Sequence, residues 1–406
     1  MSGPESGARR AFDVTGYRPL WATGLIWHIA RWMAVFASSY WLNELTGDPL
    51  RVQLVGAAFT APMFLGGLLA GTLADRVDGR RVVAAALVTL APLSGVMALC
   101  VRGEFWPVAS TYVFVFLIGV GNVIDMTTRR SLAYELAGVA LLTNAAAMET
   151  FALHAGSMVG SVAGGAVIEV MGVDGVYAGI CVVYLLAAGS LIRAFTMAGT
   201  RLVRVPDATR SVREELRASY RLLVDNPTLR RFLVFTIVMN FFYYAFVPLV
   251  PVFAARLGVG PLLAGLLAAA IGAGTMTGSL VVARLQPERR GALHIGGVVG
   301  AMSFLILFSQ LRWYPAALVA LLIAGFLGSG FGTTQSALVV SMVEPEMRGR
   351  ALGALSMAIG ALPFGNFTLG LLARQTDPRW AVTISVVVGL AIVVVWQARH
   401  PELRRL

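Results

Sequence analysis

The sequence predicts an all-α polytopic membrane protein with twelve transmembrane helices, six before and six after a polar linker, and with both termini in the cytoplasm. Of its 406 residues, 57% are apolar and only 13% are charged, which is about half the charge of an average soluble domain. Apolar runs of bilayer length recur along the chain, and arginines gather in alternate connections between them. Lipid must cover this hydrophobic surplus, so we expect a multi-pass protein of the inner (cytoplasmic) membrane.

The apolar runs fall into two groups of six. A helix needs roughly 20 apolar residues to cross a bilayer. The first six runs cover 19–43, 52–74, 82–101, 106–127, 141–169 and 175–198. The second six cover 231–255, 261–283, 292–311, 314–341, 351–373 and 379–398. The expected units are therefore an N-terminal set of helices in 1–198, a cytoplasmic linker in 199–229 and a C-terminal set in 230–406.

The linker carries one apolar stripe at helical spacing. Its stretch SVREELRASYRLLVDNPTLRRF places four apolar side chains on one face and charges elsewhere: Leu216, Tyr220, Leu223 and Val224. This pattern predicts an amphipathic helix at the cytoplasmic surface, which Asn226 and Pro227 would end. A covalent tether between the two sets explains the segment fully, and a regulatory role stays an alternative.

The arginines orient the chain. Short cytoplasmic loops retain Lys and Arg. If both termini are cytoplasmic, that side holds 25 arginines, the opposite side holds six, and Arg31 lies within the first run. This asymmetry supports an even number of crossings.

Composition also argues against several other classes of protein. The 32 basic residues are all Arg, and without a lysine the chain cannot form a Walker-type phosphate loop. The net charge of +11 is scattered in small groups, so nucleic acid is not an expected partner. Cys100 and Cys181 lie inside apolar runs, and neither a metal-ligand cluster nor a nucleophile motif is present. We expect no enzyme activity, no cofactor and no metal.

A dense group of charges follows the second apolar run. The stretch GTLADRVDGRR, residues 71–81, lies on the predicted cytoplasmic side, where Gly79 permits a turn and the arginines hold the loop inside. Keeping the loop on the cytoplasmic side does not require acidic residues. Asp75 and Asp78 therefore suggest ion pairs or helix-end caps that fasten one group of helices to its neighbour.

This loop resembles the motif GxLADRxxGRR of the major facilitator superfamily, and twelve runs with a central linker match that family along nearly the whole chain. The extra Asp in LADRVDGRR is similar to the branch that contains enterobactin-type and macrolide-type exporters. Two further stretches agree with that branch: ELRASYRLLVDNPTLRRF and EPEMRGRALGALSMAIGALPFGNFTLGLLA.

The resemblance implies two six-helix bundles around a central cavity that opens alternately to each side. It also implies a conformational latch in which Asp75 caps the eleventh helix. The other residues of the implied latch are Arg76, Gly79, Arg80, Asp125 and Arg129. In the second half, Val282 stands where Asp75 stands in the first, so the latch is expected on one side only.

Glycines recur every fourth residue in two of the runs. Gly156, Gly160 and Gly164 share one helical face, as do Gly274 and Gly278, and such stripes let helices approach closely. The string GSVAGG at 160–165 also resembles the GPxxGG signature of drug antiporters, with Ser161 in place of the proline. Tight packing and an antiporter signature are compatible interpretations.

Four ionisable residues lie at bilayer depth. They are His28 and Arg31 in the first run and Glu149 and His154 in the fifth, and each costs roughly 2.5–3.5 kcal/mol unless it is paired. Counting from the cytoplasmic edge puts His28 level with Glu149, and Arg31 level with His154. Glu149 and Arg31 could form a permanent ion pair, or Glu149 could carry a proton and release Arg31. His28 is either a proton relay or a hydrogen-bonding cavity residue.

The remaining candidates for a cavity wall are aromatic or weakly polar: Trp27, Trp32, Asn240, Tyr243, Tyr244, Gln335 and Asn366. Such a lining suits bulky amphipathic molecules better than sugars or ions. The sequence therefore predicts a secondary transporter, monomeric by default, that exports a small drug-like or siderophore-like compound in exchange for protons. Uptake or flipping of a metabolite or lipid is the alternative, and a membrane receptor is a third.

Overall fold

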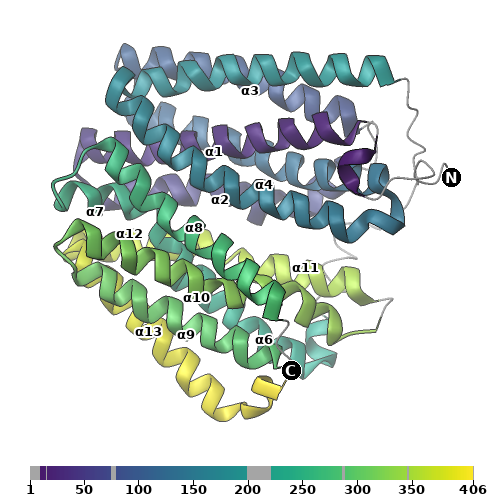
Figure 1. Cartoon of the computed structure of the whole chain (residues 1–406). Helices are drawn as coiled ribbons and strands as arrows, with labels where there is room; N and C mark the ends of the chain where they lie inside the picture. Colours follow the sequence, from purple (N-terminus) through teal and green to yellow (C-terminus); the bar gives the residue numbers. More distant parts are fainter. Residues whose placement is uncertain are drawn as a thin grey trace.

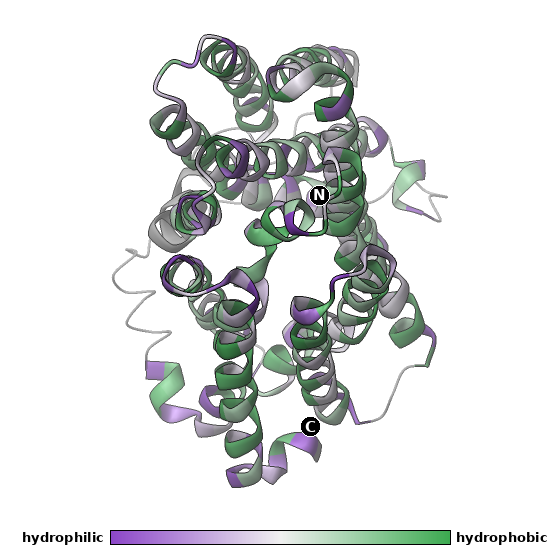
Figure 2. Ribbon diagram, turned by 90° about the vertical axis from the view of Figure 1, so that its left-hand side faces the viewer, coloured by the Kyte–Doolittle hydropathy of each residue, from purple (hydrophilic) through white to green (hydrophobic). Residues whose placement is uncertain are grey.

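In the computed structural model, residues 10–14, 16–74, 79–198, 221–285, 289–344 and 347–405 are described, and every regular element among them is helical. Nine helical stretches within these ranges are long and apolar enough to cross a membrane. Hydrophobic residues cover the helices, while hydrophilic residues concentrate near helix ends and connections (Figure 2). The prediction of an all-helical, multi-pass membrane protein is therefore confirmed.

The first half of the chain contains four long helical elements after a short turn of helix. They are η1 (Ala11–Asp13), α1 (Tyr17–Thr46), α2 (Pro49–Ala74), α3 (Gly79–Arg102) and α4 (Pro107–Ala198). The 92 residues of α4 do not form one rod. Gly138 and Gly172 take φ angles of 68° and 79°, a left-handed conformation that glycine adopts without a steric penalty.

The chain folds back at these two glycines. The rings of Phe114 and Tyr177 lie 5.1 Å apart, although a straight helix would separate them by about 95 Å. We therefore refer to the first (107–137), second (139–171) and third (173–198) segments of α4.

The second half begins at Asn226, whose side chain accepts a hydrogen bond from the Leu229 amide and caps α6 (Pro227–Val238). Its next elements are η2 (Met239–Tyr243), η3 (Tyr244–Leu249), α7 (Val250–Arg256), α8 (Pro261–Leu285) and α9 (Arg290–Gln310). They are followed by α10 (Tyr314–Ser341), α11 (Arg348–Ile359), α12 (Leu362–Gln375), α13 (Pro378–Arg399) and η5 (Pro401–Arg405).

Two runs of helix in this half are irregular. Between α6 and α7 the backbone passes through a π-helical turn, η2, and a 3-10 stretch, η3, that contains Pro248. Proline lacks an N–H and clashes with the preceding turn, so the ladder of hydrogen bonds breaks there. Pro363 similarly follows the break between α11 and α12. Irregular backbone at membrane depth is tolerated where protein or a cavity borders it.

The expected linker helix is only partly described. Residues 221–225 are helical, and Leu222 among them is buried. Leu216 and Tyr220 lie outside the described residues, so the amphipathic helix stays a prediction.

The molecule has two distinct ends. Arg231, near the start of α6, forms an ion pair with Glu402 at the carboxyl terminus. Asp48, just after α1, forms one with Arg374 at the end of α12. The start of α1 and the carboxyl-terminal η5 lie at the same end of the molecule (Figure 1), which we call the termini end, and Asp48 and Arg374 lie at the opposite, far end. Figure 1 shows the first half of the chain above the second.

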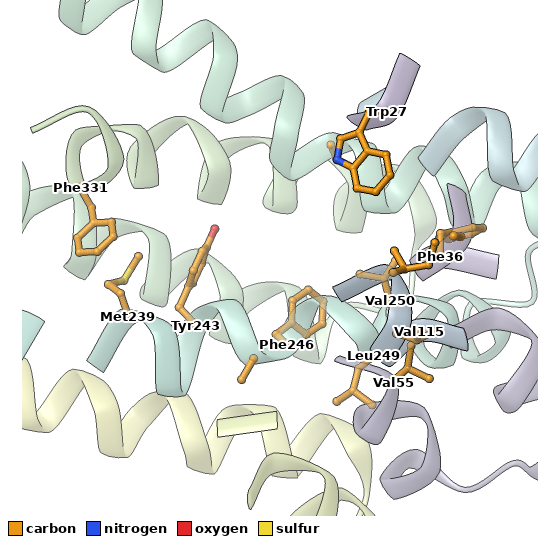
Figure 3. Packing of buried hydrophobic residues seen from close by; sticks show 14 of the residues in the cluster. Trp27, Phe36, Val55, Val115, Met239, Tyr243, Phe246, Leu249, Val250 and Phe331 are labelled. Carbon is orange, nitrogen blue, oxygen red and sulfur yellow. The ribbon is translucent and has the colours of Figure 1, made fainter. Parts of the chain in front are cut away.

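The two halves share an apolar contact region. Here α2 packs against η3 and α12, α1 against η3 and α7, and the second segment of α4 against α8. Figure 3 shows Phe246, Leu249 and Val250 of the second half beside Val55 and Val115 of the first. These residues belong to one continuous buried apolar cluster.

An ion pair at the far end ties the end of α7 to the start of α13. Asp377 caps α13 by accepting a hydrogen bond from the Arg379 amide, and both its carboxylate oxygens accept hydrogen bonds from Arg256. The hydrogen bonds from Arg256 are the main reason that the pKa of Asp377 falls to about 2. The folded state therefore stabilises the charged carboxylate.

We expect Asp377→Asn to lower the melting temperature of the detergent-solubilised protein at pH 7. The loss corresponds to about 1 kcal/mol, since the pair is partly exposed and screened by solvent. Because its pKa is lowered in the folded state, the Asp377 carboxylate stabilises the protein at pH values above 3.8, the ordinary pKa of the group. That stabilisation is lost as the pH falls toward 2. The difference between wild type and variant should therefore shrink below about pH 4.

Thermal melts across this pH range measure the effect. Glu402→Gln, which removes an exposed ion pair with Arg231, is the control and should change little. Equal melting temperatures for wild type and Asp377→Asn at pH 7 would contradict the assignment.

Candidate functional site

A buried ion pair joins α1 to the first segment of α4. Asp125 and Arg129 lie one turn apart, and their side chains are 2% exposed. Arg129 donates three hydrogen bonds to the Asp125 carboxylate, at 2.6–3.1 Å. Its Nη1 also donates to the Leu20 carbonyl and the Thr23 hydroxyl of α1, at 2.9 and 3.1 Å. Gly24 leaves the room that the Arg129 side chain fills.

A second arginine continues this row of polar residues toward the middle of the helices. Asn122 precedes Asp125 by one turn and so shares its face of α4. The Asn122 amide oxygen accepts a hydrogen bond from Nη1 of Arg31, which is 4% exposed. The Arg31 guanidinium also lies 5.4 Å from the ring of Trp32 and 5.8 Å from that of Phe59. We call Arg31, Asn122, Asp125 and Arg129 the polar seam.

The two arginines of the polar seam differ in the number and charge of their hydrogen-bond acceptors. Arg129 has a carboxylate and two further acceptors. Arg31 has one neutral acceptor, and its Nε finds none among the described residues. Therefore only one of the two buried cations is compensated by a direct ion pair.

The register between α1 and the second segment of α4 differs from the expected one. The Trp21 indole donates to the Met148 carbonyl, at 2.9 Å, and Gly156 lies against His28 without room for a side chain. Glu149 therefore lies near Trp21, about 10 Å along the helix axis from His28. The expected equal depth of His28 and Glu149 was wrong, and Asn122, not Glu149, bonds Arg31.

A cavity lies between the halves, near the middle of the helices. Its volume is about 230 Å³. The walls come from α1, the second segment of α4, η3 with α7, and α8. The lining includes Trp32, Phe36, Ser39, His154, Ser157, Tyr244, Ile271 and Thr275. It contains aromatic rings, hydroxyl groups and one histidine, but neither a carboxylate nor an arginine.

Two of the seven expected cavity residues, Trp32 and Tyr244, line this cavity. Trp27 is fully buried and stacks on Tyr184, with ring centroids 5.5 Å apart. Tyr243 is buried with its ring against Tyr244. Trp27 therefore faces the third segment of α4, and Tyr243 is not among the residues that line the cavity.

The three amides among the expected cavity residues are held elsewhere. Asn240 donates to the Thr236 carbonyl, and Gln335 donates to the Thr236 hydroxyl at 2.7 Å. With its amide oriented to satisfy its neighbours, Asn366 donates to the Ala245 carbonyl and accepts from the Ala57 amide. Asn366 therefore ties the two halves together instead of lining the cavity.

Polar contacts between the halves gather toward the far end. Asp48 pairs with Arg374 at 3.7 Å, and Glu169 accepts a hydrogen bond from the Leu262 amide at 3.0 Å. The Gln53 amide donates to the Ala245 carbonyl at 2.9 Å. These contacts join the two halves on the far side of the cavity.

The glycine stripes lie at close helix contacts. Gly156, Gly160 and Gly164 face α1, where the first two leave no room for a side chain. On the neighbouring face, the backbone of Ser161 contacts Gly265 of α8. The string GSVAGG thus lies between α1 and the other half of the protein. Gly274 and Gly278 pack against the backbone of α10.

Part of the expected latch lies outside the described residues, namely Asp75 and Arg76, and the side chain of Arg80 is likewise undescribed. Gly79, at the start of α3, lies against Thr128 and Leu132, and a Cβ there would meet each at 3.0 Å. The start of α3 therefore lies beside the turn of α4 that follows Asp125 and contains Arg129.

Sequence reasoning missed Asn122, the one hydrogen-bond partner that Arg31 has among the described residues. The signal was present, because Asn122, Asp125 and Arg129 are spaced by three and four residues within an apolar run. Such spacing puts three polar side chains on one helical face.

We expect Asp125→Asn to destabilise the detergent-solubilised protein strongly, by about 3–5 kcal/mol, because it leaves the Arg129 charge buried without a counter-charge. The double variant Asp125→Asn, Arg129→Met should lose less than the two single variants together. Melting temperatures of all four proteins form the cycle. Arg231→Gln, in an exposed pair, is the control. Strictly additive losses would show that the two groups do not interact.

Comparison with known proteins agrees with this architecture. The Enterobactin exporter EntS of Salmonella choleraesuis (strain SC-B67) is 25% identical over 357 residues, covering 85% of this chain and 83% of that protein. The protein of the same name from Citrobacter koseri (strain ATCC BAA-895 / CDC 4225-83 / SGSC4696) is 24% identical over 356 residues, with 85% and 82% covered.

Solved structures resemble the fold at low sequence identity. A bacterial homologue of the human lysosomal transporter Spinster, inward-facing and unoccupied, superposes with a TM-score of 0.71 at 14% identity over 98% of this chain and 97% of its own. The nucleoside transporter NupG gives 0.69 at 14% identity over 94% and 98%. The family model of the Major Facilitator Superfamily matches residues 20–365. With most of its length matched, this chain belongs to the Major Facilitator Superfamily and is a membrane transporter.

Proposed function

We propose that this protein is a secondary active transporter that exports a small amphipathic organic compound by alternating access, coupled to protons. The observation that carries the proposal is a mid-helix cavity between two halves that touch toward the far end. The two relatives described above are enterobactin exporters, which favours export.

The proposed topology has twelve crossings in two six-helix bundles, 1–198 and 230–406, joined by the linker 199–229. The reversals at Gly138 and Gly172 support three crossings within α4. The arginine asymmetry supports cytoplasmic termini in the inner membrane. In this proposed orientation the far end is periplasmic and closed, so the conformation is inward-facing. The cavity then takes substrate from the cytoplasm. The transporter is proposed to act as a monomer.

The cavity lining favours an amphipathic substrate. Trp32, Phe36, Tyr244 and Ile271 offer apolar and aromatic surface, while Ser39, Ser157 and Thr275 offer separate hydroxyl groups. Sugars need denser polar coordination than this. A flat, partly aromatic compound of drug or siderophore type fits these walls best.

The proposed latch joins the loop at residues 75–80 to the buried pair of Asp125 and Arg129. Its basis is the contact of Gly79 with Thr128 and Leu132 and the resemblance of the loop to the family motif. Closing the termini end would bring Asp75 to the start of α11 and stabilise the outward-facing state.

In a deletion strain we expect accumulation of a fluorescent amphipathic compound to rise, and the restored gene to lower it. Lower accumulation in the deletion strain would instead indicate uptake.

Asp75→Asn should slow export about fivefold or more while expression stays normal, since latch couplings of this kind are worth about 1–3 kcal/mol. Glu135→Gln, an exposed acid on α4, is the matched control. Normal flux through Asp75→Asn would remove the latch role.

Proton coupling is proposed to involve Glu149, His154 and His28, with Arg31 tuning their charge. His154 lines the cavity, and Glu149 lies nearer the termini end. This arrangement allows a proton and a substrate to occupy the same half of the transport path in turn.

Glu149→Gln should abolish substrate accumulation driven by an imposed pH step in proteoliposomes, because the amide cannot carry the proton. Downhill exchange of substrate should continue. Substrate flux after the pH step measures the effect, with Glu135→Gln as the control. Undiminished pH-driven accumulation in Glu149→Gln would refute its role as the proton carrier.

A further inference from the structure

The polar seam carries more positive than negative charge. Asp125 is its one carboxylate, and Arg129 engages both carboxylate oxygens. Arg31 has the Asn122 amide oxygen and two aromatic faces. Within the described ranges, no acid lies within 4 Å of the Arg31 guanidinium nitrogens.

Arg31 lies where an uncompensated charge is hardest to solvate. It is the fifteenth of the thirty residues of α1, midway between the two ends of the helix. Amide and ring contacts compensate a guanidinium only in part. Arg129 shows what a structural arginine receives in the same seam, namely a carboxylate, a carbonyl and a hydroxyl.

The charge of Arg31 is close to the cavity. The Trp32 ring lines the cavity and lies 5.4 Å from the Arg31 guanidinium carbon. Among the described residues that line the cavity, none is an acid that would offset this charge. A low-dielectric wall screens it weakly, so the cavity favours anions and disfavours cations.

The second half of the protein does not supply the missing negative charge. The buried polar side chains described there are hydroxyls, amides and one histidine, His294, which contacts Thr334 at 2.9 Å. The excess positive charge thus belongs to the first-half wall of the cavity.

We infer that the transported compound is an anion, in which a carboxylate, sulfonate or phenolate is attached to an aromatic body, and that Arg31 selects for its charge. The inference rests on the proposed function, because it assigns the cavity to the substrate. The aromatic body lies against Trp32 and Tyr244, and the anionic group reaches the Arg31 guanidinium beside Trp32. Arg31 is therefore the specificity-determining residue of the site.

The test uses three ligands with one ring system and different charges: 2-naphthoate, 2-naphthamide and 2-naphthylmethylammonium. Isothermal titration calorimetry of the purified full-length protein in one detergent gives the dissociation constants. Wild type should bind naphthoate roughly tenfold or more tightly than naphthamide and bind the ammonium compound most weakly.

Arg31→Gln should bring the ratio of naphthoate to naphthamide affinity close to one, while Arg31→Lys, which keeps the charge, should retain a preference for naphthoate. Arg51→Gln is the matched control. Its side chain is 50% exposed at the far end, so the ratio should not change. Melting temperatures show whether each variant is folded.

Two results would overturn the inference. Equal affinities in wild type, or a preference for the ammonium compound, would do so without any variant. An unchanged ratio in a folded Arg31→Gln protein would do so as well. Because binding is measured without a gradient, selective binding without transport would support Arg31 as a charge-selective binding residue and contradict the proposed function. Export of compounds irrespective of their charge would contradict the selection of anions by Arg31 and leave the proposed export function intact.

Discussion

The desolvation of Arg129 governs how the first half of the protein is assembled. A guanidinium buried among apolar helices is stable only when its donors and its charge are both satisfied. Here Asp125 supplies the charge, and Leu20 and Thr23 of α1 supply further acceptors. Consequently α1 and the first segment of α4 are held at one register, which in turn places Asn122 beside Arg31 and Trp32 beside the cavity.

Helix positions were largely predictable from sequence, whereas contacts between helices were not. Each expected apolar range lies mostly in helix, because hydrophobic length is a property of the local sequence. The depth of Glu149 was not predictable, since it depends on how far α1 slides past α4, and Gly156 and Trp21 set that distance through packing. Of seven expected cavity residues, Trp32 and Tyr244 face the cavity, because helix rotation decides which ring points inward.

The two halves differ in how they are held. The first half has a buried ion pair, whereas the described buried polar contacts of the second half involve uncharged groups and histidine. The irregular backbone lies mainly in the second half, at η2, η3 and the break between α11 and α12. A half that contains a buried ion pair therefore faces one whose helices are interrupted, and such interruptions are natural points of bending.

The contact between the second segment of α4 and α8 has a mechanical consequence. Ser161 and Gly165 meet Gly265 and Pro261 through their backbones. Smooth surfaces of this kind can part and rejoin without rotamer changes. The rate at which these two helices separate should then depend on how quickly water reaches the carbonyl groups at this contact, and not on the unlocking of side chains.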